Sequence, residues 1–147
     1  MKGMGIYMEN QPNWQPIQNL PIIANLIDGQ FADAKEQYVS LLEARNKPHV
    51  LNDTTIQRTI HVYAEQLEFV WIFEEQLSKW KKEERLTPIE QSEIKRLQGK
   101  VQQLHSILTD ILALTEKLKE GTYEKVMAKS DWQLGIESLQ RIKKSYY

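Results

Sequence analysis

Residues 87–121, TPIEQSEIKRLQGKVQQLHSILTDILALTEKLKEG, carry the clearest structural signal in this sequence. Thr87, Pro88 and Glu90 match a capping box, in which a threonine and a glutamate close the first turn of a helix that has proline at its first position. Apolar residues then recur every three or four positions for roughly four heptads. These seam positions are Ile94, Leu97, Val101, Leu104, Leu108, Ile111, the polar Thr115, and Leu118. The pattern predicts a helix of about 33 residues that ends at a glycine cap, Gly121.

A second long helix is predicted before this one, from a cap at Asn52 or Asp53 to about Arg85. Its apolar positions alternate between spacings of four and three, and one carboxylate, Glu74, fills the remaining gap in the series. The apolar positions are Ile56, Ile60, Tyr63, Leu67, Val70 and Leu77.

The two long helices should form an antiparallel hairpin, because only Leu86 and Thr87 would separate them. Facing residue numbers would then add up to about 172 if the turn centres near residue 86. On that register Glu74 lies near Gln98 and Gln102. The same register places Phe73 against Gly99, which would leave room for a bulky ring.

Three further helices complete the prediction. The first runs from about Asn19 to a stop at residues 46–48, with Pro21 in its first turn. A short helix follows Gly121 to about residue 129, and a last helix begins at a second capping box over residues 130–133. The last helix would turn three apolar side chains inward, namely Trp132, Ile136 and Leu139. We therefore expect an all-α antiparallel helical bundle of about four main helices plus one short helix.

Composition narrows the class of protein. The chain has 147 residues, and residues 1–18 are expected to form a flexible N-terminal arm before a single helical-bundle domain over residues 19–147. Cysteine is absent, which excludes a disulfide scaffold and a thiolate metal site. A net charge of −1 argues against bulk electrostatic binding to nucleic acid or to anionic membranes. Without an apolar run of roughly 18–20 residues or a signal-peptide pattern, we expect a cytoplasmic protein with no membrane partner.

Residues 69–73 and 107–114 are apolar around most of the helix circumference, so both stretches need cover on several sides. Flanking helices of the same bundle could provide that cover. The other interpretation is self-association, and we expect a homodimer because the last helix is much shorter than the hairpin. Trp14 either folds back onto the bundle or anchors a partner. The candidate interface residues are Phe69, Trp71, Ile72, Ile107, Leu112 and Trp14.

No catalytic or metal-binding pattern stands out. Di-metal bundles use a glutamate three residues before a histidine, and His49, His61 and His105 all lack it. We therefore expect no metal, no cofactor and no enzymatic activity. Glu74, the one carboxylate on a seam position, is expected to be buried, where such a residue more often fixes register than reacts. The alternative is an internal small-molecule cavity, as in a binding protein or an enzyme, with polar groups from Glu74, Gln98, Gln102 and Tyr63.

The C-terminus is basic and aromatic. Such a tail could contact phosphate and stack a base, but cations that complement a helix dipole explain it more simply. Its residues are Arg141, Lys143, Lys144, Tyr146 and Tyr147. The sequence thus favours a non-enzymatic helical-bundle protein that works through protein–protein contact. A cavity for a small molecule and weak nucleic-acid binding by the tail are the alternatives.

Overall fold

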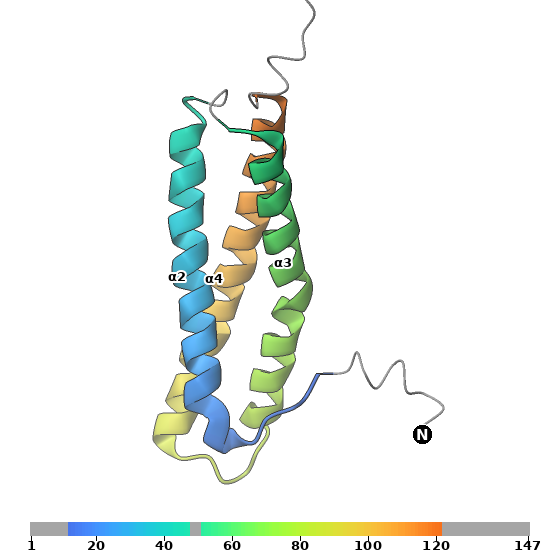
Figure 1. Cartoon of the computed structure of the whole chain (residues 1–147). Helices are drawn as coiled ribbons and strands as arrows, with labels where there is room; N and C mark the ends of the chain where they lie inside the picture. The colour runs from blue at the N-terminus through green and yellow to red at the C-terminus, as the bar shows by residue number, and fades with distance from the viewer. Residues whose placement is uncertain (1–11, 48–50, 122–147) are drawn as a thin grey trace, which may run out of the picture.

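The computed structural model describes residues 12–47 and 51–121 of the chain. They contain three long helices, α2 (Leu20–Ala44), α3 (Asp53–Lys81) and α4 (Pro88–Leu118). The 3-10 helix η2 (Ile17–Asn19) precedes α2, and η4 (Lys119–Gly121) follows α4. Figure 1 shows the three long helices side by side, which confirms the expected all-α helical bundle. The short helix and the last helix predicted after Gly121 lie outside the described residues.

Helix α4 is the centre of the bundle. It packs against both α2 and α3, whereas α2 and α3 make few close backbone contacts with each other. Because it is covered from two sides, α4 buries all eight of its predicted seam positions, Thr115 included. The Thr115 hydroxyl donates to the carbonyl of Ile111, so this buried polar group is satisfied. We call the side of the bundle between α2 and α3, away from α4, the open side (Figure 1).

The start of α4 follows the prediction closely, and its end does not. Thr87 Oγ1 accepts a hydrogen bond from the N–H of Glu90 at 3.1 Å, and Glu90 Oε1 accepts from the N–H of Thr87 at 2.9 Å. The helix nevertheless ends at Leu118, and Gly121 lies in the 3-10 turn without a positive φ. A tightened last turn therefore replaces the glycine cap that we expected.

Helix α3 ends at Lys81 rather than near Arg85, so six residues, 82–87, connect the hairpin instead of two. The N–H groups of Lys82 and Glu83 bond back to carbonyls three residues earlier, at 3.3 and 3.0 Å, and these short-range bonds close the helix. The sequence carries no helix breaker here, so the earlier end was not visible in it. The antiparallel hairpin itself is confirmed.

One line of α3 seam positions is buried and the other is not. The buried line is spaced by seven residues and consists of Ile56, Tyr63, Val70 and Leu77. In the second line Ile60 and Leu67 are half-buried and Glu74 is exposed. Only α4 covers that side of α3 among the described helices, and the expectation of a buried Glu74 is therefore wrong.

The predicted contact between Phe73 and Gly99 is also wrong. A Cβ atom placed on Gly99 would have no atom within 4 Å outside its own helix, so this glycine does not make room for a ring. Phe73 instead faces the open side, where it lies near Gln30 of α2. The ring therefore lines the groove on the open side rather than lying against Gly99 in the hairpin seam.

Candidate functional site

A groove of about 330 Å³ lies on the open side of the bundle. We call it the open-side groove, and it is lined by Gln30, Val62, Glu65, Gln66, Phe69, Ile72 and Phe73. Phe69 is 50% exposed and Val62 is 39% exposed, although both side chains are apolar. Since isolated exposed apolar residues are common, the informative feature is that these side chains share one groove between two helices.

Two polar groups define the chemistry of the open side. The Oε1 atom of Gln66 is buried and has no hydrogen-bond partner among the described residues. Tyr63 donates a hydrogen bond to Asp33 Oδ2 at 3.2 Å and so connects α3 to α2. Burial, with the nearby Asp33 carboxylate, raises the pKa of Tyr63 to about 12. The open side therefore combines an apolar groove, which Glu65 also lines, with the Tyr63–Asp33 hydrogen bond between the two helices.

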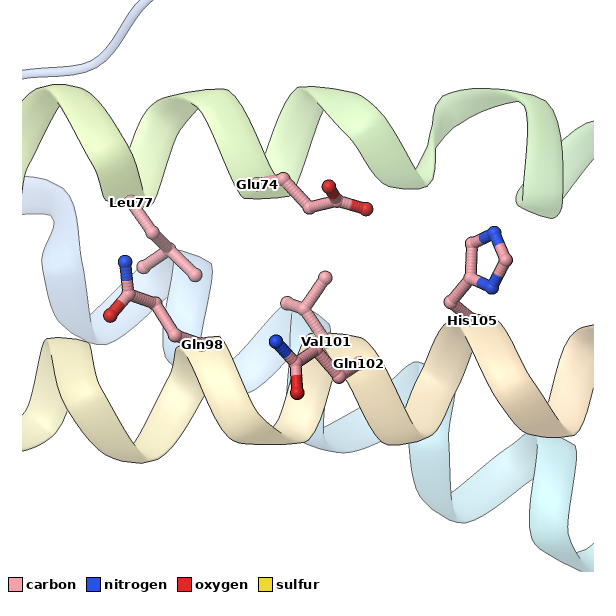
Figure 2. Close-up of a pocket in the computed structure, with 6 residues that line it drawn as sticks. All are labelled: Glu74, Leu77, Gln98, Val101, Gln102 and His105. Atoms are coloured by element: carbon pink, nitrogen blue, oxygen red, sulfur yellow. The ribbon is translucent and has the colours of Figure 1, made fainter.

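A second groove, of about 560 Å³, lies between α3 and α4. Figure 2 shows its lining, and we call it the α3–α4 groove: Glu74, Leu77, Gln98, Val101, Gln102 and His105. Three of the four polar residues that we expected around a cavity do meet here, while Tyr63 lies buried in the core. Glu74, Gln102 and His105 are exposed, so the site is an open polar groove and not an internal cavity.

The six candidate interface residues do not form one surface. Phe69 and Ile72 share the open-side groove. Trp71 is 49% exposed and contacts Trp14, whose ring lies edge-on at a centroid distance of 6.4 Å. Trp14 therefore packs onto the bundle, in agreement with the first of the two interpretations given for it. Two others, Ile107 and Leu112, are half-buried against the core.

Sequence reasoning missed Gln76 and Trp80, two buried residues near the end of α3. Gln76 is 4% exposed and Trp80 is 1% exposed. Both side chains hydrogen-bond to the backbone of Gln15, which lies more than 60 residues earlier. The three-residue spacing from Leu77 could have placed Trp80 in the core. No sequence signal links Gln76 to an N-terminal segment.

The remaining sequence predictions concern metal binding, the histidines, the basic tail and membrane insertion. Within residues 12–47 and 51–121 there is no group of three histidine, aspartate or glutamate side chains that could hold a metal ion. His61 lies 3.6 Å from Glu65 on the exposed face of α3, and His49 lies outside the described residues. The basic tail over residues 141–147 also lies outside them. None of the described helices is long and apolar enough to cross a membrane.

Comparison with known proteins does not assign the chain to a family. No protein-family model matches the chain, and neither a curated protein sequence nor a solved structure shows significant similarity to it.

Proposed function

We propose that this chain is a non-enzymatic helical-bundle protein that acts through protein–protein contact, with the open-side groove as its contact surface. The observation that carries the proposal is the exposed apolar lining of this groove, above all Phe69 and Val62. A partner helix laid into the groove would bury the exposed side chains of Phe69 and Val62. The expected compartment is the cytoplasm.

The proposed partner is a second copy of the chain. Glu65 lines the groove, and Asp33 lies one helical turn along α2 from Gln30, so this acidic and apolar surface suits a basic amphipathic helix. The chain itself encodes such a segment over residues 130–145: apolar Trp132, Ile136 and Leu139 recur at helical spacing, and three cations follow. In a homodimer each copy would receive this segment from the other. The segment lies outside the described residues, and its position is part of the proposal.

The oligomeric state tests this proposal directly. We expect the full chain to form a dimer by native mass spectrometry and by light scattering at micromolar concentration. Phe69→Glu places a charge in the groove and Trp132→Glu places one in the proposed partner segment, so each should yield monomers. Ile89→Glu is the matched control, because Ile89 is 82% exposed at the start of α4 and lies outside the groove.

Two outcomes would contradict the homodimer. A monomeric chain that loses thermal stability with both Phe69→Glu and Trp132→Glu would show that the segment covers the groove of its own copy. A monomer that is indifferent to both substitutions would remove the groove as a contact surface. If only Ile89→Glu dissociated a dimer, the interface would lie at the start of α4 instead.

The α3–α4 groove supports a second candidate, binding of a small polar molecule. A carboxylate, two amides and an imidazole line it together with the aliphatic Leu77 and Val101 (Figure 2). We expect any such ligand to appear as extra mass on the chain in native mass spectra, and Glu74→Gln should reduce its retention. A bare spectrum from freshly purified protein would argue against this candidate.

A further inference from the structure

The backbone of Gln15 is held by two buried side chains of α3. The N–H of Gln15 donates to Gln76 Oε1 at 2.6 Å, and Gln76 Nε2 donates to the carbonyl of Gln15 at 3.3 Å. The indole N–H of Trp80 donates to the same carbonyl at 2.9 Å. A single carboxamide therefore satisfies both backbone groups of one residue, much as a neighbouring β-strand would. This recognition needs a free peptide N–H but no particular side chain at position 15.

The residue before Gln15 is recognised through its side chain. The Trp14 ring packs edge-on against Trp71, and the Lys79 ammonium lies 5.0 Å from the centre of the Trp14 ring. An edge-to-face aromatic pair and a cation–π contact both favour an aromatic residue at this position. We call Trp71, Gln76, Lys79 and Trp80 together the arm-binding surface of α3.

The docked segment, residues 12–16, is built as a rigid peptide. Pro16 has φ −70° and ψ 159°, which is polyproline-type extended backbone, and a second proline begins the segment. The side-chain Nε2 of Gln15 donates to the carbonyl of Asn13 at 2.9 Å, and its side-chain Oε1 accepts from Nδ2 of Asn19 at 2.6 Å. Prolines and local hydrogen bonds lower the entropy lost on binding. Figure 1 shows this segment leaving the start of α2 and reaching α3.

We propose that the arm-binding surface of α3 is a peptide-binding site for an extended segment with tryptophan two residues before proline. The chain's own residues 12–16 fill it as a tethered ligand, and its partner is a protein that presents the same pattern. The hydrogen bonds and ring contacts with α3 are made by residues 14 and 15, and one further hydrogen bond, from the Asn19 side chain to the Gln15 side chain, ties the segment to the start of α2. Because a tethered ligand acts at an effective concentration in the millimolar range, a partner competes only when it is locally concentrated or binds more tightly. The site is separate from the open-side groove, so it does not depend on the function proposed above.

The test uses the full chain with a weakened arm. The double substitution Trp14→Ala and Gln15→Pro removes the ring and the N–H donor from the docked segment. The probe is a fluorescein-labelled peptide with the sequence of residues 11–18, QPNWQPIQ, measured by fluorescence anisotropy. We expect the weakened chain to bind this peptide at least tenfold more tightly than the unsubstituted chain does.

Two altered peptides separate the recognition steps. N-methylation of the glutamine that corresponds to Gln15 removes one hydrogen and keeps every side chain, and tryptophan replaced by alanine removes the ring. Each change should weaken binding at least tenfold, as should Gln76→Leu in the weakened chain. A weakened chain that is folded by circular dichroism but binds the peptide no better than a scrambled one would overturn the proposal.

A second measurement covers the case in which the weakened chain does not fold. The unsubstituted, ¹⁵N-labelled chain is titrated with the peptide to millimolar concentration, and the indole resonance of Trp80 is followed by NMR. Competition with the docked segment should shift or broaden this resonance, and the N-methylated peptide should leave it unchanged. An identical response to both peptides, or none to either, would show that residues 12–16 are only a structural strap.

Discussion

The hydroxyl of Tyr63 donates a hydrogen bond to Asp33 Oδ2 at 3.2 Å, and this contact joins α3 to α2 across the open side of the bundle. These two helices otherwise contact mainly α4. The tyrosine must be protonated to donate, and burial beside the Asp33 carboxylate keeps it so, because its pKa rises to about 12. The neutral phenol is therefore a hydrogen-bonded connection between the two helices across the open side.

Replacing Tyr63 with phenylalanine should lower the free energy of unfolding by about 0.5–1.5 kcal/mol at neutral pH, since it removes this hydrogen bond and leaves the ring. The pKa of Tyr63 is higher in the folded state than its unfolded value of 10.0. The stabilisation that the protonated Tyr63 hydroxyl provides is therefore complete below pH 10 and is lost as the pH rises from 10 towards 12. Urea titrations of both proteins across this range check the prediction, with Tyr38→Phe in α2 as the control. A stability difference that stays constant to pH 12 would contradict it.

An ion pair on the other side of the bundle should give the opposite pH dependence. Arg96 of α4 donates to both carboxylate oxygens of Asp28 in α2, at 3.0 and 2.9 Å, and its Nε donates to Glu93 at 2.7 Å. The Arg96 guanidinium lowers the pKa of both carboxyl groups. The stability that this pair contributes is thus present above the ordinary carboxyl pKa and is lost as the pH falls through the lowered values.

We therefore expect Asp28→Asn to destabilise the bundle at pH 7 and to have almost no effect at pH 2. The loss should be no more than about 1 kcal/mol, because the pair is partly exposed and salt screens it. Chemical denaturation at both pH values, with and without added salt, provides the measurement. Glu116→Gln is the control, since Glu116 makes a longer, 3.8 Å pair within one turn. An Asp28→Asn effect as large at pH 2 as at pH 7 would mean that packing, not charge, is lost.

How far the sequence predicts the fold depends on how each helix is covered. Helix α4 has a neighbour on two sides, so its heptad seam is buried along its whole length and could be read from the sequence. Helix α3 has a similar pattern but keeps Glu74 in water, because the described bundle holds no helix beyond that edge. A sequence pattern identifies the apolar face of a helix, but it does not say how many neighbours cover that face.

In the candidate sites, too, some contacts could be predicted from the sequence and others could not. The hairpin register brought Glu74, Gln98 and Gln102 into one groove, as expected from short-range geometry. The bond between Gln76 and Gln15 depends on two segments that are 61 positions apart, and a polar glutamine has no periodicity that would indicate burial. Contacts of this kind depend on tertiary placement, and only the structure revealed them.

Gly99 offers a stabilising substitution. It lies inside α4, and a Cβ atom there would meet open space. Alanine has the higher helix propensity and lowers the entropy of the unfolded chain, so Gly99→Ala should raise the free energy of unfolding by about 0.4–1 kcal/mol. Thermal and urea denaturation give the value, and Gly29→Ala in α2 should behave alike because its surroundings are equally open. A destabilised Gly99→Ala protein would show that a segment outside the described residues packs against this glycine.

Trp80→Phe tests how the end of α3 holds residues 12–16. Phenylalanine keeps an aromatic ring in the core but removes the N–H that donates to the carbonyl of Gln15 at 2.9 Å. Gln76 still bonds to Gln15, so we expect this segment to open more often while the bundle stays folded. Amide hydrogen exchange at Gln15 should then quicken by about tenfold for a loss of about 1.4 kcal/mol, while α4 amides exchange as before. Phe73→Leu, a change to a ring that lies on the open side, is the control for loss of aromatic packing. If α4 exchanged faster together with Gln15, Trp80 would support the core as a whole, and its indole N–H would have no separate role in holding the segment.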